Sequence, residues 1–179
     1  MEQPAYRFEI RLARPDEAAR VRAIEQAAGA RFSGLGLIDH TFGATFGDAL
    51  AIDELVRLID AGQVWVGCRD GVAVGMVIAS QRDGLAYVEE MDVVPEHGRQ
   101  GLGARLLDCV CEWARARGCP AITLSTFATV PWNQPFYERH GFRALQQHEW
   151  APWMRRVREK EAQHGLRVEA RVFMRRELI

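Results

Sequence analysis

Hydrophobic residues along the chain follow two spacings that alternate from segment to segment. Apolar residues at every second position, or in short unbroken runs, are typical of β-strands, whereas apolar residues three or four positions apart indicate one face of a helix. The first pattern predicts strands at residues 8–12, 63–68, 72–80, 85–94 and 121–127, from residue 142 onward, and at 166–177. The second predicts helices at residues 15–28, 52–59, 101–117, 131–140 and 154–163. Residues 29–47 show neither period and are expected to form a loop or a broken helix.

The order of these segments predicts how the sheet is built. Arg69-Asp70-Gly71 and Gln81-Arg82-Asp83-Gly84 are turn sequences, so the strands on either side of each turn should pair antiparallel. A helix separates the strand at 85–94 from the strand at 121–127, which makes this a β-α-β crossover. We therefore expect a single domain over residues 1–179 with a mixed α/β fold. Its central sheet should be mostly antiparallel, flanked by helices, with one β-α-β crossover.

Composition and charge narrow the range of partners. A chain of 179 residues fits one domain, and its formal net charge of −1 gives no general attraction to nucleic acid or to anionic membranes. No apolar run reaches membrane-spanning length, and Met1-Glu2-Gln3-Pro4 lacks the basic and apolar regions of a signal peptide, so a cytoplasmic protein is expected. The four cysteines and five histidines match no metal-ligand spacing, which predicts reduced thiols and no metal site.

The sequence Gly98-Arg99-Gln100-Gly101-Leu102-Gly103 is the first candidate for chemistry. It lies between a strand that ends at Val94-Pro95 and an amphipathic helix. The first N–H groups of a helix have no intrahelical partner, and glycines there let a phosphate approach the backbone. The turn lacks the lysine and hydroxyl residue of a Walker loop, and its glycine spacing is the reverse of the dinucleotide-binding fingerprint. Two interpretations remain from these residues alone: a phosphate-binding turn, or a strand-to-helix turn without a ligand.

Two stretches of the chain resemble motifs of the GNAT superfamily of N-acetyltransferases. The first is residues 91–97 followed by the glycine turn, which is similar to the acetyl-CoA-binding motif of that family, with Gly98 where the family usually carries Gln or Arg. The second is Asn133 with Phe136-Tyr137-Glu138-Arg139-His140-Gly141-Phe142, in which the gap from Asn133 to Tyr137 is shorter than usual. The order of predicted elements is also that of the family, so the resemblance extends over essentially the whole chain.

The resemblance implies that acetyl-CoA is the acyl donor. Backbone N–H groups of the turn would hold its pyrophosphate, and those near Met91 and Val93 would pair with the pantetheine arm and stabilise the oxyanion. The implied cofactor-binding residues lie on the strand, in the turn and before the second motif: Met91, Asp92, Val93, Gly98, Arg99, Gln100, Gly101, Leu102, Gly103, Ala104 and Asn133.

Acetylation of an amine needs a base, because an alkylammonium ion with a pKa of about 10 has no free electron pair at neutral pH. Glu89 and Glu90 are the candidate carboxylates, and the resemblance favours Glu89 as the base. Adjacent strand residues point to opposite faces, so one of the two is expected to face the cleft unless a bulge intervenes. The resemblance also implies that Tyr137 is the acid that protonates the departing CoA thiolate.

We therefore expect an N-acetyltransferase that acts on a primary amine, with a small molecule as the leading acceptor. Residues 29–47 and 146–152 flank the presumed cleft and are expected to contact that acceptor. The alternatives are a protein or peptide N-acetyltransferase, a non-catalytic acyl-CoA sensor that needs neither Glu89 nor Tyr137, and a plain interaction domain. The protein is expected to be a monomer or a homodimer without a nucleic-acid, membrane or metal partner. The helix at 154–163 is assigned a solvated face that carries Arg155, Arg156 and Arg158.

Overall fold

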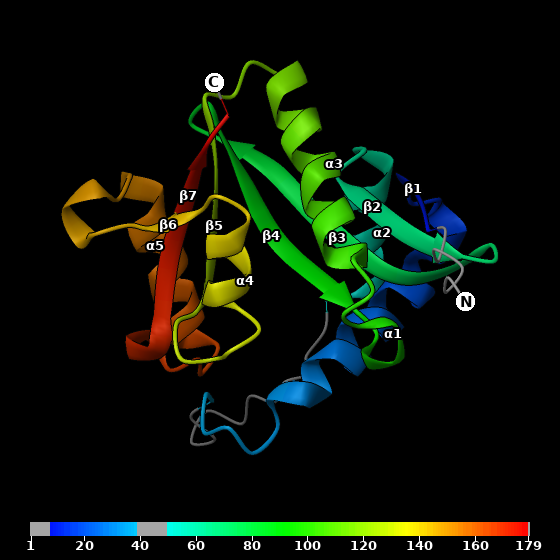
Figure 1. Ribbon diagram of the computed structural model, residues 1–179, viewed down its shortest axis with the longest axis horizontal. Coiled ribbons are helices and arrows are strands. Elements are labelled where there is room, and N and C mark those ends of the chain that lie inside the picture. The colour runs from blue at the N-terminus through cyan, green and yellow to red at the C-terminus, as the bar shows by residue number, and fades with distance from the viewer. Residues whose placement is uncertain (1–7, 39–49, 179) are drawn as a thin grey trace, which may run out of the picture.

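The computed structural model describes residues 8–38 and 50–178. The strands of these residues form one seven-stranded sheet in the order β1-β2-β3-β4-β5-β7-β6 (Figure 1). Among them β4 and β5 pair in parallel, and the other neighbours pair antiparallel. This arrangement confirms the predicted mixed sheet with its β-α-β crossover. The strands are β1 (Glu9–Leu12), β2 (Val64–Arg69), β3 (Val72–Arg82), β4 (Leu85–Val93), β5 (Ala121–Phe127), β6 (Arg143–Ala144) and β7 (Arg171–Glu177).

Helices cover both faces of this sheet. α3 (Leu102–Ala116) lies in front of β3 and β4 in Figure 1, and α1 (Ala18–Gly29) and α2 (Ile52–Asp60) lie behind them. α4 (Gln134–Arg139) and α5 (Pro152–Gln163) flank the half of the sheet that contains β5, β6 and β7. The apolar stripe predicted for α3 faces the sheet, and its buried members include Leu102, Leu106, Val110 and Ala114.

The first turn of α3 lies close against the sheet because two strand residues there have no side chain. The Leu102 side chain is 1% exposed and fills the space next to Gly67 and Gly75. A Cβ on Gly75 would come within 2.9 Å of Leu102, and a Cβ on Gly67 would come closer still. Glycine inside a strand often marks such a close approach. The contact fixes the position of the turn that precedes α3.

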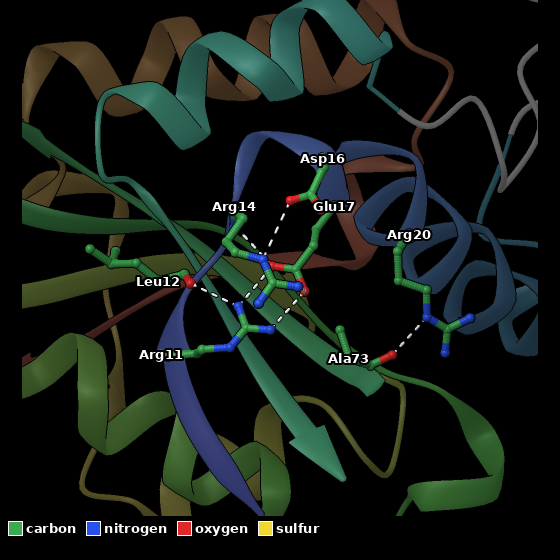
Figure 2. Close-up of polar contacts among 7 residues, drawn as sticks. All are labelled: Arg11, Leu12, Arg14, Asp16, Glu17, Arg20 and Ala73. Carbon is green, nitrogen blue, oxygen red and sulfur yellow. Dashed lines mark hydrogen bonds and ion pairs between the residues drawn. The ribbon is translucent and has the colours of Figure 1, made fainter. Parts of the chain in front are cut away.

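An ion pair joins β1 to the beginning of α1 (Figure 2). Arg11 on β1 donates two hydrogen bonds of 2.7 Å to the Glu17 carboxylate, and the Arg14 N–H donates a third of 2.8 Å. Glu17 lies in the 3-10 turn that leads into α1. On α1 itself, Arg20 donates to the Ala73 carbonyl at 2.7 Å. α1 is thereby tied to both β1 and β3.

β4 and β5 pair over a short distance and then separate. Their parallel ladder joins residues 86–88 to residues 122–124. Beyond the ladder β4 continues along β3 and β5 continues along β7, so the two strands diverge toward the lower part of Figure 1. We call the open stretch, residues 89–93 of β4 and residues 125–127 of β5, the strand fork. It divides the sheet into one half built on β1 to β4 and another built on β5 to β7.

Residues 30–38, called the strap below, connect these two halves. The strap follows α1, and its Phe32 ring lies 5.8 Å from the ring of Phe127 at the end of β5. Further along, the Leu37 carbonyl accepts a hydrogen bond of 2.9 Å from the Arg167 N–H, just before β7. The strap therefore reaches from the helix on one half of the sheet to the strands of the other half.

Two assignments made from the sequence are wrong. The last strand begins at Arg171 instead of residue 166, because the preceding residues form a 3-10 turn, η6 (Val168–Ala170). Arg158 does not lie on a solvated face: its side chain is 12% exposed and forms an ion pair of 2.9 Å with Glu161, one helical turn further along α5. Periodicity alone does not reveal that β7 covers this side of the helix.

The sequence predicted a loop or a broken helix for residues 29–47, and the structure describes residues 29–38 of this segment. α1 ends at Gly29 and continues directly into a 3-10 turn, η2 (Ala30–Phe32), which agrees with a broken helix. Residues 39–47 lie outside the described residues. In the described part of the chain, no helix combines the length and the apolar character needed to cross a membrane.

Candidate functional site

Main-chain groups of β4 line one side of the strand fork. The Val94 N–H donates to the Val74 carbonyl of β3 at 3.0 Å. Because backbone groups alternate in direction along a strand, the N–H and C=O groups of Met91 and Val93 point away from β3. β5 has already separated there. These groups are therefore placed to pair with an extended ligand, as an edge strand does.

A β-bulge at Glu89 places two neighbouring acidic residues on one face of the sheet. Ile78 pairs with Glu90, and the next residue of β3, Ala79, pairs with Val88, so Glu89 is the extra residue. The Glu89 and Glu90 side chains both lie on the face opposite α3. The sequence alone predicted that only one of these acids would face the cleft unless a bulge intervened. The structure contains that bulge, and both acids lie on the same face.

Glu89 is held in an ion pair. Arg82 donates to its two carboxylate oxygens at 2.7 and 2.8 Å, and the Ser80 hydroxyl donates to one of them. The Arg82 guanidinium lies over the rings of Tyr87 and Trp153, 4.8 and 5.5 Å from their centroids. Both oxygens of Glu89 are therefore occupied, and the carboxylate is fixed in place.

Glu90, Asp92 and Glu25 form an acidic group at the fork. The Glu90 and Asp92 carboxyls lie two residues apart on β4, on the same face of the sheet. Protein packed around the fork removes water from the Glu90 carboxyl and raises its pKa to about 7, and the charge of Glu25 raises it further. Arg171 and the Met91 N–H act in the opposite direction. The Glu90 side chain also keeps surface that is accessible to water, so an acceptor can reach it.

Desolvation and the neighbouring Glu90 also raise the pKa of Asp92 well above its usual value. Because two close carboxylates resist ionising together, the pair retains a proton near neutral pH. Among the described residues, these included, no group of three His, Cys, Asp or Glu side chains could hold a metal ion.

Tyr137 projects from α4 toward the same site. Its ring packs edge-on against Phe136 and Phe142, at centroid distances of 5.1 and 5.7 Å. Burial raises the pKa of Tyr137 well above its ordinary value, and the charges of Glu90 and Asp92 raise it further. The phenol therefore keeps its proton at neutral pH and can donate it. The structure brings the predicted acid within electrostatic reach of these carboxyls.

Asn133 begins the helix that carries Tyr137. Its carbonyl accepts hydrogen bonds from the N–H groups of Phe136 and Tyr137 at 2.9 and 3.2 Å. The gap from Asn133 to Tyr137 that is short in the sequence is thus one turn of helix. Asn133 positions Tyr137 through the backbone, and its contact with the cofactor stays a prediction.

The glycine turn has the backbone conformation of an anion-binding site. Arg99 and Gly101 have positive φ angles of 58° and 81°, and α3 begins at Leu102. The Arg105 N–H donates to the Gly101 carbonyl at 3.2 Å. The amides of residues 102–104 precede this bond and have no carbonyl one turn earlier in the helix. They are available to a phosphate, which the helix dipole also favours.

Two other residues of the turn have bonds within it. The Gly98 N–H donates to the Pro95 carbonyl at 3.1 Å, so this predicted cofactor amide is already occupied. The Gln100 side chain donates to the Glu96 carbonyl at 3.3 Å. These bonds shape the turn, and they leave phosphate binding to the amides that follow.

Two charged residues of the site escaped the sequence analysis. Glu25 on α1 accepts a hydrogen bond of 3.2 Å from the Leu50 N–H, and Arg171 on β7 lies over the Phe127 ring. Neither belongs to a motif. The sequence gives one weak indication for Glu25: it directly follows Ile24, a buried residue on the helix face turned toward the sheet. Arg171 is one of several charged residues on its strand and carries no such signal.

The second segment expected to contact the acceptor, residues 146–152, packs against β7. The Trp150 ring lies 4.9 Å from that of Phe173, edge to face. Glu149 forms an ion pair of 2.8 Å with Arg143 on β6. The structure gives this segment a packing role, and its contact with the acceptor stays a prediction.

The chain is similar to known proteins in sequence and in fold. It is 35% identical over 60 residues to the glucosamine 6-phosphate N-acetyltransferase of Trypanosoma brucei brucei, a match over 34% of this chain and 39% of that protein. The PaiA N-acetyltransferase of Thermoplasma acidophilum, solved with coenzyme A, superposes with a TM-score of 0.72 at 13% identity, over 96% of this chain and 99% of that one. The N-acetylglutamate synthase of Neisseria gonorrhoeae, solved with coenzyme A and N-acetyl-glutamate, gives 0.73 at 16% identity, over 96% of this chain and 35% of that one.

The family match covers the elements that build the fork. The model of the Acetyltransferase (GNAT) family matches residues 36–142, which include β4, the glycine turn, α3 and Tyr137. At identities this low, the solved structures support the fold itself. Family match and fold agree, and this chain belongs to the acetyltransferase (GNAT) family.

Proposed function

We propose that this protein is an N-acetyltransferase that transfers the acetyl group of acetyl-CoA to a primary amine. The observation that carries the proposal is the placement of a base and an acid, Glu90 and Tyr137, at a strand fork with open main-chain groups. The similar PaiA and N-acetylglutamate synthase structures hold coenzyme A. Both the fold and the side chains at the fork support this chemistry.

The residues present fit the acyl donor. The amides of residues 102–104 and the dipole of α3 suit the pyrophosphate, and the positive φ angles of Arg99 and Gly101 shape the turn around it. The backbone of Met91 and Val93 suits the extended pantetheine arm. This assignment brings the thioester to the fork, beside the carboxyls of β4.

We assign the base to Glu90 instead of Glu89, which the sequence favoured. Both oxygens of Glu89 are occupied by Arg82 and Ser80. Glu90 is exposed at the fork, and its raised pKa of about 7 suits a base that works near neutral pH. Glu89 would then hold Arg82 in place on the aromatic rings behind it.

The reaction follows from these positions. Glu90 takes a proton from the ammonium group, and the nitrogen uses its freed electron pair to attack the thioester carbonyl carbon. The N–H group of Val93 donates to the oxyanion that forms. When the carbon–sulfur bond breaks, Tyr137 gives its proton to the CoA thiolate. The nitrogen releases its second proton as the amide forms, and this proton restores the Tyr137 phenol by way of solvent.

The charges and the strap favour a small cationic acceptor. Glu25, Glu90 and Asp92 lower the electrostatic potential at the fork, which attracts an ammonium group and repels an anion. The strap crosses from α1 to the strands beyond the fork, next to its open end. We therefore propose a small amine as the acceptor, in preference to a side chain on a folded protein.

The test measures CoA release from acetyl-CoA over a panel of small amines, amino acids and peptides. Glu90→Gln should lower kcat/KM by roughly 10² to 10⁴, the usual contribution of a general base, and Tyr137→Phe by a similar factor. Glu89→Gln, the matched control on the adjacent residue, should lower it much less. The wild-type kcat/KM should rise with pH up to about 7, because Glu90 acts only when ionised.

Two results would contradict the proposal. A large loss with Glu89→Gln and a small one with Glu90→Gln would return the base to Glu89. Tight binding of acetyl-CoA in calorimetry without turnover of any amine would indicate a non-catalytic acyl-CoA sensor instead of an enzyme.

A further inference from the structure

One main-chain carbonyl at the fork is bonded by a side chain from another strand. The Ala128 N–H donates to the Ala170 carbonyl at 2.8 Å. Alternation along β5 therefore directs the Ser125 carbonyl away from β7 and toward the fork. In a continuous sheet this carbonyl would accept an N–H from β4. Here it accepts a hydrogen bond of 3.1 Å from Nη2 of Arg171.

Arg171 reaches this carbonyl by crossing β5. It pairs with Phe127 in the β5–β7 ladder, and its guanidinium carbon lies 4.5 Å from the centroid of the Phe127 ring. The side chain is 13% exposed. The guanidinium is therefore held between the aromatic ring and the open edge of β5.

Glu161 on α5 anchors Arg171 from the other side. Its Oε1 accepts from both Nε and Nη2 of Arg171 at 2.9 Å, and its Oε2 pairs with Arg158 at 2.9 Å. The three side chains are 11 to 13% exposed. Because one carboxylate is shared by two guanidinium groups, this cluster keeps one net positive charge.

That charge acts on the reacting groups. Among residues 8–38 and 50–178, charged and titratable groups on four elements face Glu90: Glu25 from α1, Glu89 and Asp92 from β4, Tyr137 from α4 and Arg171 from β7. Arg171 is the positively charged residue of this set, and the other members are carboxyls and a phenol. It lowers the pKa of both Glu90 and Tyr137, against the combined effect of burial and the other carboxyls.

We propose that Arg171, anchored by Glu161, is a positioning residue of the acetyl transfer. It satisfies the Ser125 carbonyl at the open edge of β5, and it holds a permanent positive charge at the fork, on the side where Glu90 acts as the base. Its catalytic role rests on the proposed function, whereas its effect on Glu90 is a property of the protein alone. Arginine suits this role because its guanidinium stays charged and carries several N–H donors, which can bind a carbonyl and a carboxylate at the same time.

The test follows the Glu90 carboxyl directly, by a pH titration of protein labelled with 13C at the glutamate side-chain carboxyl. Glu90→Gln assigns the signal. In Arg171→Gln the midpoint of the Glu90 titration should move upward by roughly half a unit to one unit, because the opposing positive charge is lost. Arg171→Lys keeps the charge and should leave the midpoint near the wild-type value. If Arg171→Gln does not fold, the lysine variant still tests the inference.

Arg158→Gln is the matched control. It breaks the other ion pair of Glu161 and removes one positive charge from the cluster. Arg158 lies over Trp150 and Phe173, whereas Arg171 is the residue bonded to the Ser125 carbonyl, so the Glu90 midpoint should move less than in Arg171→Gln. Equal shifts in Arg171→Gln and Arg158→Gln, or no shift in a folded Arg171→Gln, would overturn the inference. A shift in Arg171→Lys equal to that in Arg171→Gln would do the same.

The titration needs no turnover, so absence of acetyl transfer in the wild type would count against the proposed function alone. Where turnover is measured, the ascending limb of kcat/KM against pH should move upward with the Glu90 midpoint.

Discussion

At the residue scale, the missing Cβ of Gly67 decides how closely α3 lies on the sheet. Gly67→Ala would drive a methyl group into the Leu102 side chain, which is buried and has little room to move. Overpacking of this kind costs about 1 to 3 kcal/mol, and we expect the free energy of unfolding in urea to fall by that amount. The turn before α3 should shift as well, so acetyl-CoA should bind more weakly in calorimetry.

Gly103→Ala is the control for this substitution, made one residue after Leu102. A Cβ there would lie 3.5 Å from Phe136, an ordinary contact, and alanine favours helix over glycine by up to about 1 kcal/mol. Stability should therefore be unchanged or slightly higher. An equal loss in both variants would show that Leu102 can move and that the clash at Gly67 does not set the position of the helix.

The same scale shows why sequence alone placed some site residues and missed others. The positive φ of Gly101 and the position of Tyr137 follow from local motifs, because neighbours in the chain determine them. The difference between Glu89 and Glu90 depends on a bulge, which changes the register by one residue and leaves no local signal. Arg171 acquires its role from Glu161 on a separate helix and from the separation of β4 and β5.

At the element scale, the junction of β1 with α1 should depend on pH. The hydrogen bonds from Arg11 lower the pKa of Glu17 to about 2 from its ordinary value of 4.5. A carboxyl with a depressed pKa in the folded state stabilises that state fully above the unfolded pKa, and the contribution disappears as pH falls through the folded pKa. We expect Glu17 to contribute roughly 2 to 3 kcal/mol at pH 7, lost between pH 4.5 and 2.

Urea unfolding of Glu17→Gln and wild type over this pH range checks the prediction. The difference in stability should be constant near neutral pH and shrink toward zero in acid. Asp16→Asn is the control, since the Asp16 side chain is 77% exposed and its pairing with Arg14 is long, 3.4 Å. Exposed pairs contribute between about 0 and 1 kcal/mol. A difference for Glu17→Gln that does not change with pH would contradict the assigned role.

The elements themselves were largely predictable. Strands and helices with strong periodicity, from β2 through β5, lie close to their predicted positions, because turns and buried faces are encoded locally. The beginning of β7 was misplaced: residues 166–170 alternate like a strand, but η6 and the contact of Arg167 with the strap take their backbone out of the sheet. Contacts between distant segments override the local pattern at that point.

At the scale of the whole molecule, the two halves of the sheet meet in the short β4–β5 ladder and are linked again by the strap. The ladder lies on the far side of the fork from Phe127, whereas the strap contacts Phe127 directly. Phe32 also lies 6.1 Å from the ring of Trp132, which follows β5. The width of the fork at its open end should therefore depend on this aromatic contact.

Phe32→Ala should loosen the open end of the fork and leave the donor side unchanged, because the glycine turn is held separately by Leu102 against Gly67 and Gly75. The acceptor would lose its fixed position, so its KM should rise roughly threefold to tenfold, equivalent to about 1 kcal/mol. The Kd for acetyl-CoA, measured by calorimetry, should stay the same. Leu35→Ala lies in the same strap, where the leucine is 46% exposed, and should alter neither constant. Equal weakening of donor and acceptor binding in Phe32→Ala would mean that the strap supports the whole fork instead of its acceptor end.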